Sequence, residues 1–117
     1  MKYLFIINDA PYGAEKAYNA LRMAMTLQKE HPQTEVLVFL MADAIACALP
    51  GQNTPQGYYN IERMLKGILL KQGQVKLCGS CVDARGIREL KLIDGIQIGT
   101  MSELTQWSVD AEKVFVF

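Results

Sequence analysis

Two cysteines with Cys-x-x-Cys spacing, Cys78 and Cys81, are the residues of this chain whose types and spacing most clearly allow chemistry. Cys78 ends an apolar run, Gln74–Cys78, that is typical of a buried strand, and residues 79–84 are expected to start a short helix with Arg85-Gly86 near its end. A thiol at a strand-to-helix junction faces unpaired backbone N–H groups and the positive end of the helix dipole, which favour the thiolate. Cys78 is therefore either a reactive nucleophile or, since free cysteine is often buried, a packed core residue.

Other uses of the cysteines fit the sequence less well. A structural zinc site needs four ligands, whereas this chain has one Cys-x-x-Cys, a distant Cys47 and a single histidine, His31. A cysteine hydrolase needs a histidine base, and His31 lies beside a proline at the end of an expected helix, far from the cysteine pair. We therefore expect no metal and no cofactor. A thiol redox enzyme remains open, because thioredoxin-like proteins also place Cys-x-x-Cys after a strand.

Length and composition indicate one domain over residues 1–117, because half of the 117 residues are hydrophobic. Lys and Arg together count 12, as do Asp and Glu, so no overall charge favours nucleic acid or an anionic membrane as a partner. The sequence has no recognisable signal peptide or membrane-spanning segment, and three cysteines do not fit a secreted disulfide framework. We expect a cytoplasmic protein with reduced thiols.

The elements that would position the cysteines alternate along the chain. Two apolar runs, Lys2–Asn8 and Glu35–Met41, are typical of parallel strands covered on both faces, and the helical spacing between them, from Ala14 to Glu30, predicts a βαβ unit. The alternation continues to the last residue, which favours a single doubly wound α/β domain with a mostly parallel four- or five-stranded sheet flanked by helices. The remaining expected elements are a short helix at 42–49, a helix capped by Asn60 and stopped by Gly73, strands at 74–78, 96–98 and 114–117, a short helix from 79 to about 86, and a helix to about 110 with a Thr100/Glu103 capping box.

Three loops follow strands, and open α/β sheets bind ligands at the edge formed by the carboxyl ends of their strands. These loops, residues 8–13, residues 43–57 and the chain after Cys78, are therefore expected to converge on the thiol. Strand ends and turns explain most of their polar residues equally well without a ligand. The candidate supporting or binding residues from these loops are Asn8, Tyr12, Asp43 and Gly79.

Several short motifs of this chain occur in the same order as in a known protein family. They are Asn8-Asp-Ala-Pro-Tyr-Gly13, Phe39-Leu-Met-Ala-Asp-Ala44, Gly51-Gln52, Gly57-Tyr58, Asn60-Ile61, Lys76-Leu77-Cys78-x-x-Cys81, Arg85-Gly86-Ile87, Leu92-Ile-Asp-Gly95 and Ile98-Gly-Thr100. With these motifs, the chain resembles the DsrE/DsrF-like family of small sulfur-relay proteins, which includes TusD, and especially its YchN-type branch. The resemblance covers essentially the whole chain.

The resemblance implies a homotrimer or homohexamer and a cysteine that holds sulfane sulfur as a persulfide. In the family this cysteine precedes an Arg-Gly-Ile/Val element by six intervening residues, which corresponds here to Cys78. Such a carrier needs a thiolate and a pocket that tolerates an anion, but no histidine base. The implied partners are sulfur donor and acceptor proteins or small sulfur species. Arg85 would support the sulfur only if the chain bends back or if it acts across a subunit boundary, and its ordinary role is that of a cation at a helix C-terminus.

Cys81 leaves the mechanism open. It follows Cys78 by three residues on the same helical face, where it could form a disulfide or attack a Cys78 persulfide and release sulfide. It could equally be a packed residue. The sequence therefore supports a persulfide carrier, a redox or sulfide-releasing enzyme that uses both cysteines, and a non-catalytic oligomeric binding protein.

Overall fold

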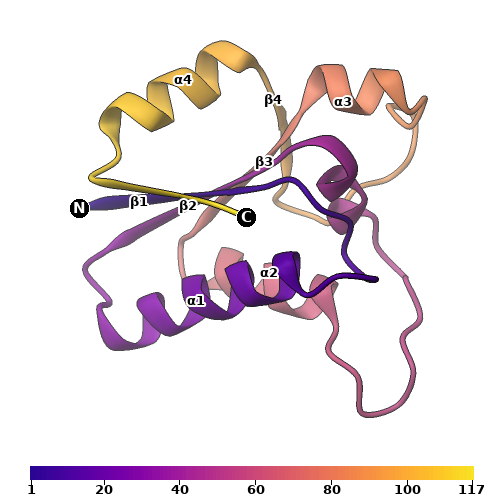
Figure 1. Ribbon diagram of the computed structural model, residues 1–117, viewed down its shortest axis with the longest axis horizontal. Helices are drawn as coiled ribbons and strands as arrows, with labels where there is room; N and C mark the ends of the chain where they lie inside the picture. Colours follow the sequence, from indigo (N-terminus) through magenta and orange to yellow (C-terminus); the bar gives the residue numbers. More distant parts are fainter.

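The computed structural model describes residues 1–117 and has a five-stranded parallel sheet at its centre, with strand order β4-β3-β2-β1-β5 (Figure 1). Every adjacent pair of strands is parallel. The central strand β2 is buried from Val36 to Leu40, which explains why its sequence is a continuous apolar run. The strands are β1 (Lys2–Ile7), β2 (Glu35–Leu40), β3 (Gln74–Cys78), β4 (Gln97–Gly99) and β5 (Lys113–Val116).

Helices cover both faces of the sheet, which confirms the doubly wound α/β prediction. The helices α1 (Lys16–Glu30) and α2 (Ile61–Leu70) lie side by side on one face, and α4 (Met101–Asp110) lies on the other (Figure 1). The short helix α3 (Gly79–Ala84) and the 3₁₀ helix η1 (Ala42–Ala48) begin where β3 and β2 end. No helix has both the length and the apolarity that crossing a bilayer requires.

The two faces of the sheet bury very different amounts of apolar surface. The cluster between the sheet, α1, α2 and η1 contains 21 buried residues, whereas the cluster under α4 contains five. Cys78 belongs to the smaller cluster, together with Phe39 and Leu104. The thiol therefore lies on the thinly covered face of the sheet.

Predicted helix caps are confirmed at two positions. The Asn60 side chain accepts a hydrogen bond from the Arg63 N–H at 2.9 Å, and Thr100 and Glu103 form a reciprocal capping box. These caps satisfy N–H groups that the first turns of α2 and α4 would otherwise leave unpaired.

Three predicted elements differ in detail. The segment expected as a short helix at 42–49 is a 3₁₀ helix over Ala42–Ala48 that begins at a positive φ of 50°. Strand β4 is one residue later than expected, because Ile98 and Gly99 are the residues that pair with Leu77 and Cys78. Strand β5 begins one residue earlier than expected, because its first residue, Lys113, pairs with Tyr3.

Candidate functional site

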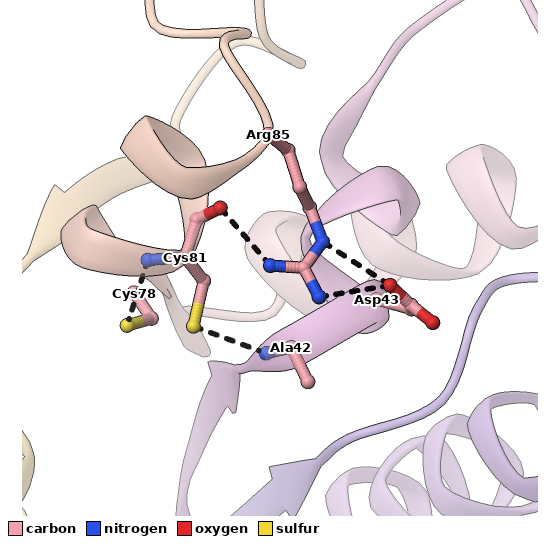
Figure 2. A network of polar contacts seen from close by, with 5 residues as sticks. All are labelled: Ala42, Asp43, Cys78, Cys81 and Arg85. Atoms are coloured by element: carbon pink, nitrogen blue, oxygen red, sulfur yellow. Dashed lines mark hydrogen bonds and ion pairs between the residues drawn. The ribbon is translucent and has the colours of Figure 1, made fainter.

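Cys78 is the N-cap residue of α3, and its sulfur accepts hydrogen bonds there (Figure 2). The Cys81 N–H donates to Cys78 Sγ at 3.4 Å, and the Ser80 hydroxyl lies 3.2 Å from the same atom. Only 6% of Cys78 is exposed. The cysteine therefore replaces the oxygen side chain that usually caps a helix, with a buried sulfur as the acceptor.

These hydrogen bonds shift the pKa of Cys78. Desolvation is the largest single influence on the Cys78 pKa and raises it, but hydrogen bonds from the Cys81 thiol, the Ser80 side chain and the two backbone N–H groups together outweigh it. The net result is a Cys78 pKa below its ordinary value. Since α3 has only six residues, its dipole is short, and these individual hydrogen bonds are the main stabilisers of the thiolate.

Cys81 has the opposite character. Desolvation and the proton that it shares with Cys78 raise the Cys81 pKa, although the Ala42 N–H opposes this effect. That N–H donates to Cys81 Sγ at 3.2 Å from a residue with a positive φ, a backbone conformation that non-glycine residues seldom adopt. All three cysteines are free thiols. Of the two thiols in the reduced pair, Cys78 is therefore the one that ionises more readily.

Arg85 lies beside Cys81 and turns away from the Cys78 sulfur (Figure 2). Its Nε and Nη2 atoms donate to Asp43 Oδ1 at 3.1 and 2.9 Å, and its Nη1 donates to the Cys81 carbonyl at 3.2 Å. Arg85 therefore links α3 to the start of η1 and holds the Ala42 N–H next to Cys81. Asp43 and Arg85, both predicted as supporting residues, are brought together around Cys81.

A cavity of about 600 Å³ opens beside Cys78. Arg88 is the cation in its lining, and its guanidinium is bound to both carboxylate oxygens of Asp83 and to the Gly79 carbonyl. Sequence analysis missed Arg88, because it lies in an irregular segment without periodicity. It also missed Ser80, although Ser80 stands within the Cys-x-x-Cys motif, and it predicted Thr100 as a helix cap but not as a residue that lines this cavity. The lining residues are Phe39, Cys78, Gly79, Ser80, Asp83, Arg88, Ile98, Gly99, Thr100 and Met101.

Gly79, another predicted support, permits a close approach between α3 and β4. A Cβ atom at this position would lie 3.2 Å from the Gly99 carbonyl oxygen and 3.2 Å from Ile98 Cγ2. Cys47 lies away from the pair in the larger apolar cluster, and burial raises its pKa to about 12. The chain has no group of three or more His, Cys, Asp or Glu residues that could hold a metal ion.

The prediction that three loops converge on the thiol is only partly right. Residues 42–43 reach Cys81, but Asn8 Nδ2 donates to the Phe117 carbonyl and so ties β1 to the C-terminal strand. The Tyr12 hydroxyl accepts from the Ile61 N–H at the start of α2, on the face opposite α4. The loop between η1 and α2 extends past α2 and away from α3 (Figure 1). The positions of these loops depend on how the helices pack, which cannot be read from the spacing of residues in the sequence.

The fold and the cysteine pair define a small doubly wound α/β protein with two free thiols at the carboxyl edge of its sheet. The chain belongs to the DsrE/DsrF-like family, whose model matches residues 1–117. It is 44% identical to the protein YchN of Escherichia coli over 116 residues, which cover 99% of this chain and 98% of that protein. It is also 38% identical over its whole length to MJ0989 of Methanocaldococcus jannaschii, which it covers completely.

Solved structures share this fold. The crystal structure of YchN from E. coli superposes with a TM-score of 0.94 and covers 99% of this chain and 98% of that chain. MTH1491 of Methanobacterium thermoautotrophicum superposes with a TM-score of 0.79 at 8% identity, with 99% of this chain and 98% of that chain covered. The second comparison shows that this arrangement of strands and helices is formed by very different sequences.

Proposed function

We propose that this chain carries sulfane sulfur as a persulfide on Cys78. Membership of the DsrE/DsrF-like family supports a role related to sulfur relay. The main structural support is the set of hydrogen bonds to Cys78 Sγ, which favours a thiolate without any histidine. The cavity next to the sulfur provides space for a donor molecule and for the added sulfur atom.

The proposed loading step is a simple displacement. The Cys78 thiolate attacks the terminal sulfur of a donor persulfide, R–S–SH, the donor S–S bond breaks, and R–S⁻ leaves. The outer sulfur is then bonded to Cys78 Sγ, and it keeps its proton or releases it to water. No water has to be activated, so the step requires no general base.

Uptake of labelled sulfur tests this proposal. The reduced protein is incubated with a small-molecule persulfide that carries radioactive sulfur, and protein-bound label is measured before and after addition of a thiol reductant. We expect stoichiometric label that the reductant removes, no label on a Cys78→Ser variant, and unchanged label on a Cys47→Ala variant. Equal labelling of the Cys78→Ser variant would refute the proposal.

A second function is favoured by the position of Cys81 in the first turn of α3. Its thiolate could attack Cys78 Sγ in the persulfide, so that a Cys78–Cys81 disulfide forms and HS⁻ leaves. A cellular thiol would then have to reduce the disulfide. Sulfide release by the loaded wild-type protein, and its absence in a Cys81→Ala variant, would favour this sulfide-releasing enzyme. Stable label in both proteins would favour the carrier.

Assembly into a homotrimer or homohexamer belongs to the same proposal. Several apolar side chains are exposed on β5 and α4, among them Val116 at 67% and Val109 at 73%, and α4 covers its face of the sheet thinly. A monomer would leave this surface in water. Sedimentation at micromolar concentration should detect the assembly, and a protein that sediments only as a monomer would contradict it.

A further inference from the structure

A cluster of tyrosines lies on the face that carries α1 and α2, where α1 meets the loop before α2. The Tyr59 ring stacks on Tyr18 at a centroid distance of 4.1 Å and on Tyr58 at 4.4 Å. The Tyr12 ring lies 5.4 Å from the Tyr59 ring, centroid to centroid, and the Tyr12 hydroxyl accepts a hydrogen bond from the Ile61 N–H at the start of α2. Arg22 lies over the Tyr18 ring, 5.1 Å from its centroid. Together these rings form a continuous aromatic surface, with the Arg22 guanidinium at its Tyr18 end.

This aromatic surface borders a groove of about 480 Å³, a volume within the range of small-molecule sites. Two methionines, Met25 and Met64, supply flexible apolar surface, and methionine sulfur contacts aromatic rings favourably. We call it the tyrosine–arginine groove and define it by its lining residues, Tyr18, Arg22, Met25, Thr26, Tyr58, Tyr59, Asn60, Arg63 and Met64.

The charged residues that line the groove are both cations. Arg22 and Arg63 both line it, no carboxylate does, and neither arginine takes part in any of the five ion pairs of the chain. A guanidinium group presents its N–H donors in a fork that matches carboxylate and sulfonate oxygens. The hydrogen bond between the Tyr58 and Tyr59 hydroxyls is the largest of the influences that raise the Tyr59 pKa to about 12, and the charge of Glu15 adds to them. This ring therefore stays neutral at physiological pH and does not repel an anion.

We propose that the tyrosine–arginine groove binds a small planar aromatic molecule that carries a carboxylate or sulfonate. The ring of the ligand packs on the tyrosine and methionine side chains, and its anionic group meets Arg22 or Arg63. None of the groove residues lines the cavity beside Cys78. The groove is therefore a second site, independent of the thiol, and the inference holds whether or not Cys78 carries sulfur.

The test uses two probes of the same shape and different charge, naphthoate and the neutral naphthamide. Their affinities are measured by calorimetry on the full chain, and the bound position is located from amide chemical-shift changes. We expect naphthoate to bind about tenfold more tightly than naphthamide, which corresponds to one charge-assisted hydrogen bond at a partly exposed site. The largest shifts are expected at Tyr18, Tyr59 and Arg63.

Arginine variants provide the second part of the test. Arg22→Gln and Arg63→Gln should each reduce the preference for naphthoate by about threefold to fivefold and leave naphthamide binding unchanged. Lys66→Gln is the matched control, because it removes a cation from the same helix as Arg63 but outside the groove, and it should change neither affinity. Equal affinity for the two probes in the wild-type protein, or shifts confined to other parts of the chain, would overturn the proposal without any need for the variants.

Discussion

The backbone N–H of Cys81 donates to the sulfur of Cys78 across 3.4 Å, so the second cysteine of the motif stabilises the thiolate of the first. The Cys81 thiol adds a further hydrogen bond, which lowers the Cys78 pKa and raises its own. The two cysteines therefore have different roles before any substrate is present. In the proposed function, Cys78 is the nucleophile, and Cys81 is a donor that becomes a thiolate only at a later step.

The first prediction concerns the pH dependence of alkylation. Because the Cys78 pKa lies below its ordinary value, its reaction with iodoacetamide should stay fast to a lower pH than that of free cysteine and should slow as the pH falls through that lowered pKa. Cys81, whose pKa is raised, should react only at higher pH. Peptide mass spectrometry after timed alkylation separates the two residues. A Cys78 rate at pH 7 no faster than that of free cysteine would contradict the assigned thiolate.

The second prediction separates the two donors that Cys81 supplies. A Cys81→Ala variant keeps the backbone N–H but loses the thiol, so the alkylation rate of Cys78 at neutral pH should fall by about twofold to tenfold, the equivalent of one modest hydrogen bond. Cys81→Ser keeps a side-chain donor and should recover most of the rate. Equal rates for the Ala and Ser variants would show that the Cys81 side chain does not tune Cys78.

The third prediction concerns the Arg85–Asp43 ion pair. Both side chains are well exposed, at 37% and 72%, so the pair should contribute no more than about 1 kcal/mol to the free energy of unfolding in a double-mutant cycle of Arg85→Gln and Asp43→Asn. Alkylation of Cys78 should change by less than about twofold, because Arg85 faces Cys81. A large loss of Cys78 reactivity in the Arg85→Gln variant would contradict this prediction and would show that Arg85 stabilises the Cys78 sulfur.

The fourth prediction tests the capping box that begins α4 and also borders the cavity beside Cys78. Thr100→Ala should lower the free energy of unfolding by about 1 kcal/mol, because the Glu103 N–H loses its acceptor. Thr105→Ala, in the exposed middle of the same helix, is the control and should be neutral or slightly stabilising, since alanine is the better helix former. Urea titrations measure both. Equal effects of the two variants would contradict the proposed role of the cap.

The sequence was sufficient to predict the strands and the position of Cys78, because both depend on local pattern. Strand β3 has the predicted bounds and helix α3 begins at the predicted residue, since the apolar run ends where the helix begins, although α3 ends at Ala84, before the expected Arg85-Gly86. The neighbours of the sulfur could not be predicted in the same way. Arg88 reaches the cavity and Arg85 does not, and the difference depends on how residues 85–90 turn after α3 rather than on spacing.

Long-range packing also explains why the positions of some loops were predicted wrongly. Tyr12 follows a strand, as predicted, but it caps α2 instead of approaching Cys78. Ala42 has no polar side chain, so no residue-type signal marks its N–H as the donor to Cys81. Backbone donors of this kind become visible only once the chain is folded.

The most direct test of the central claim is to locate the added sulfur. The reduced protein is exposed to a persulfide donor, the intact mass is recorded, and the modified peptide is sequenced by tandem mass spectrometry in the wild-type, Cys81→Ala and Cys47→Ala proteins. The account predicts a gain of one sulfur atom on Cys78 in all three proteins. A gain on Cys81 or Cys47, or no gain on Cys78 in the Cys81→Ala protein, would contradict it.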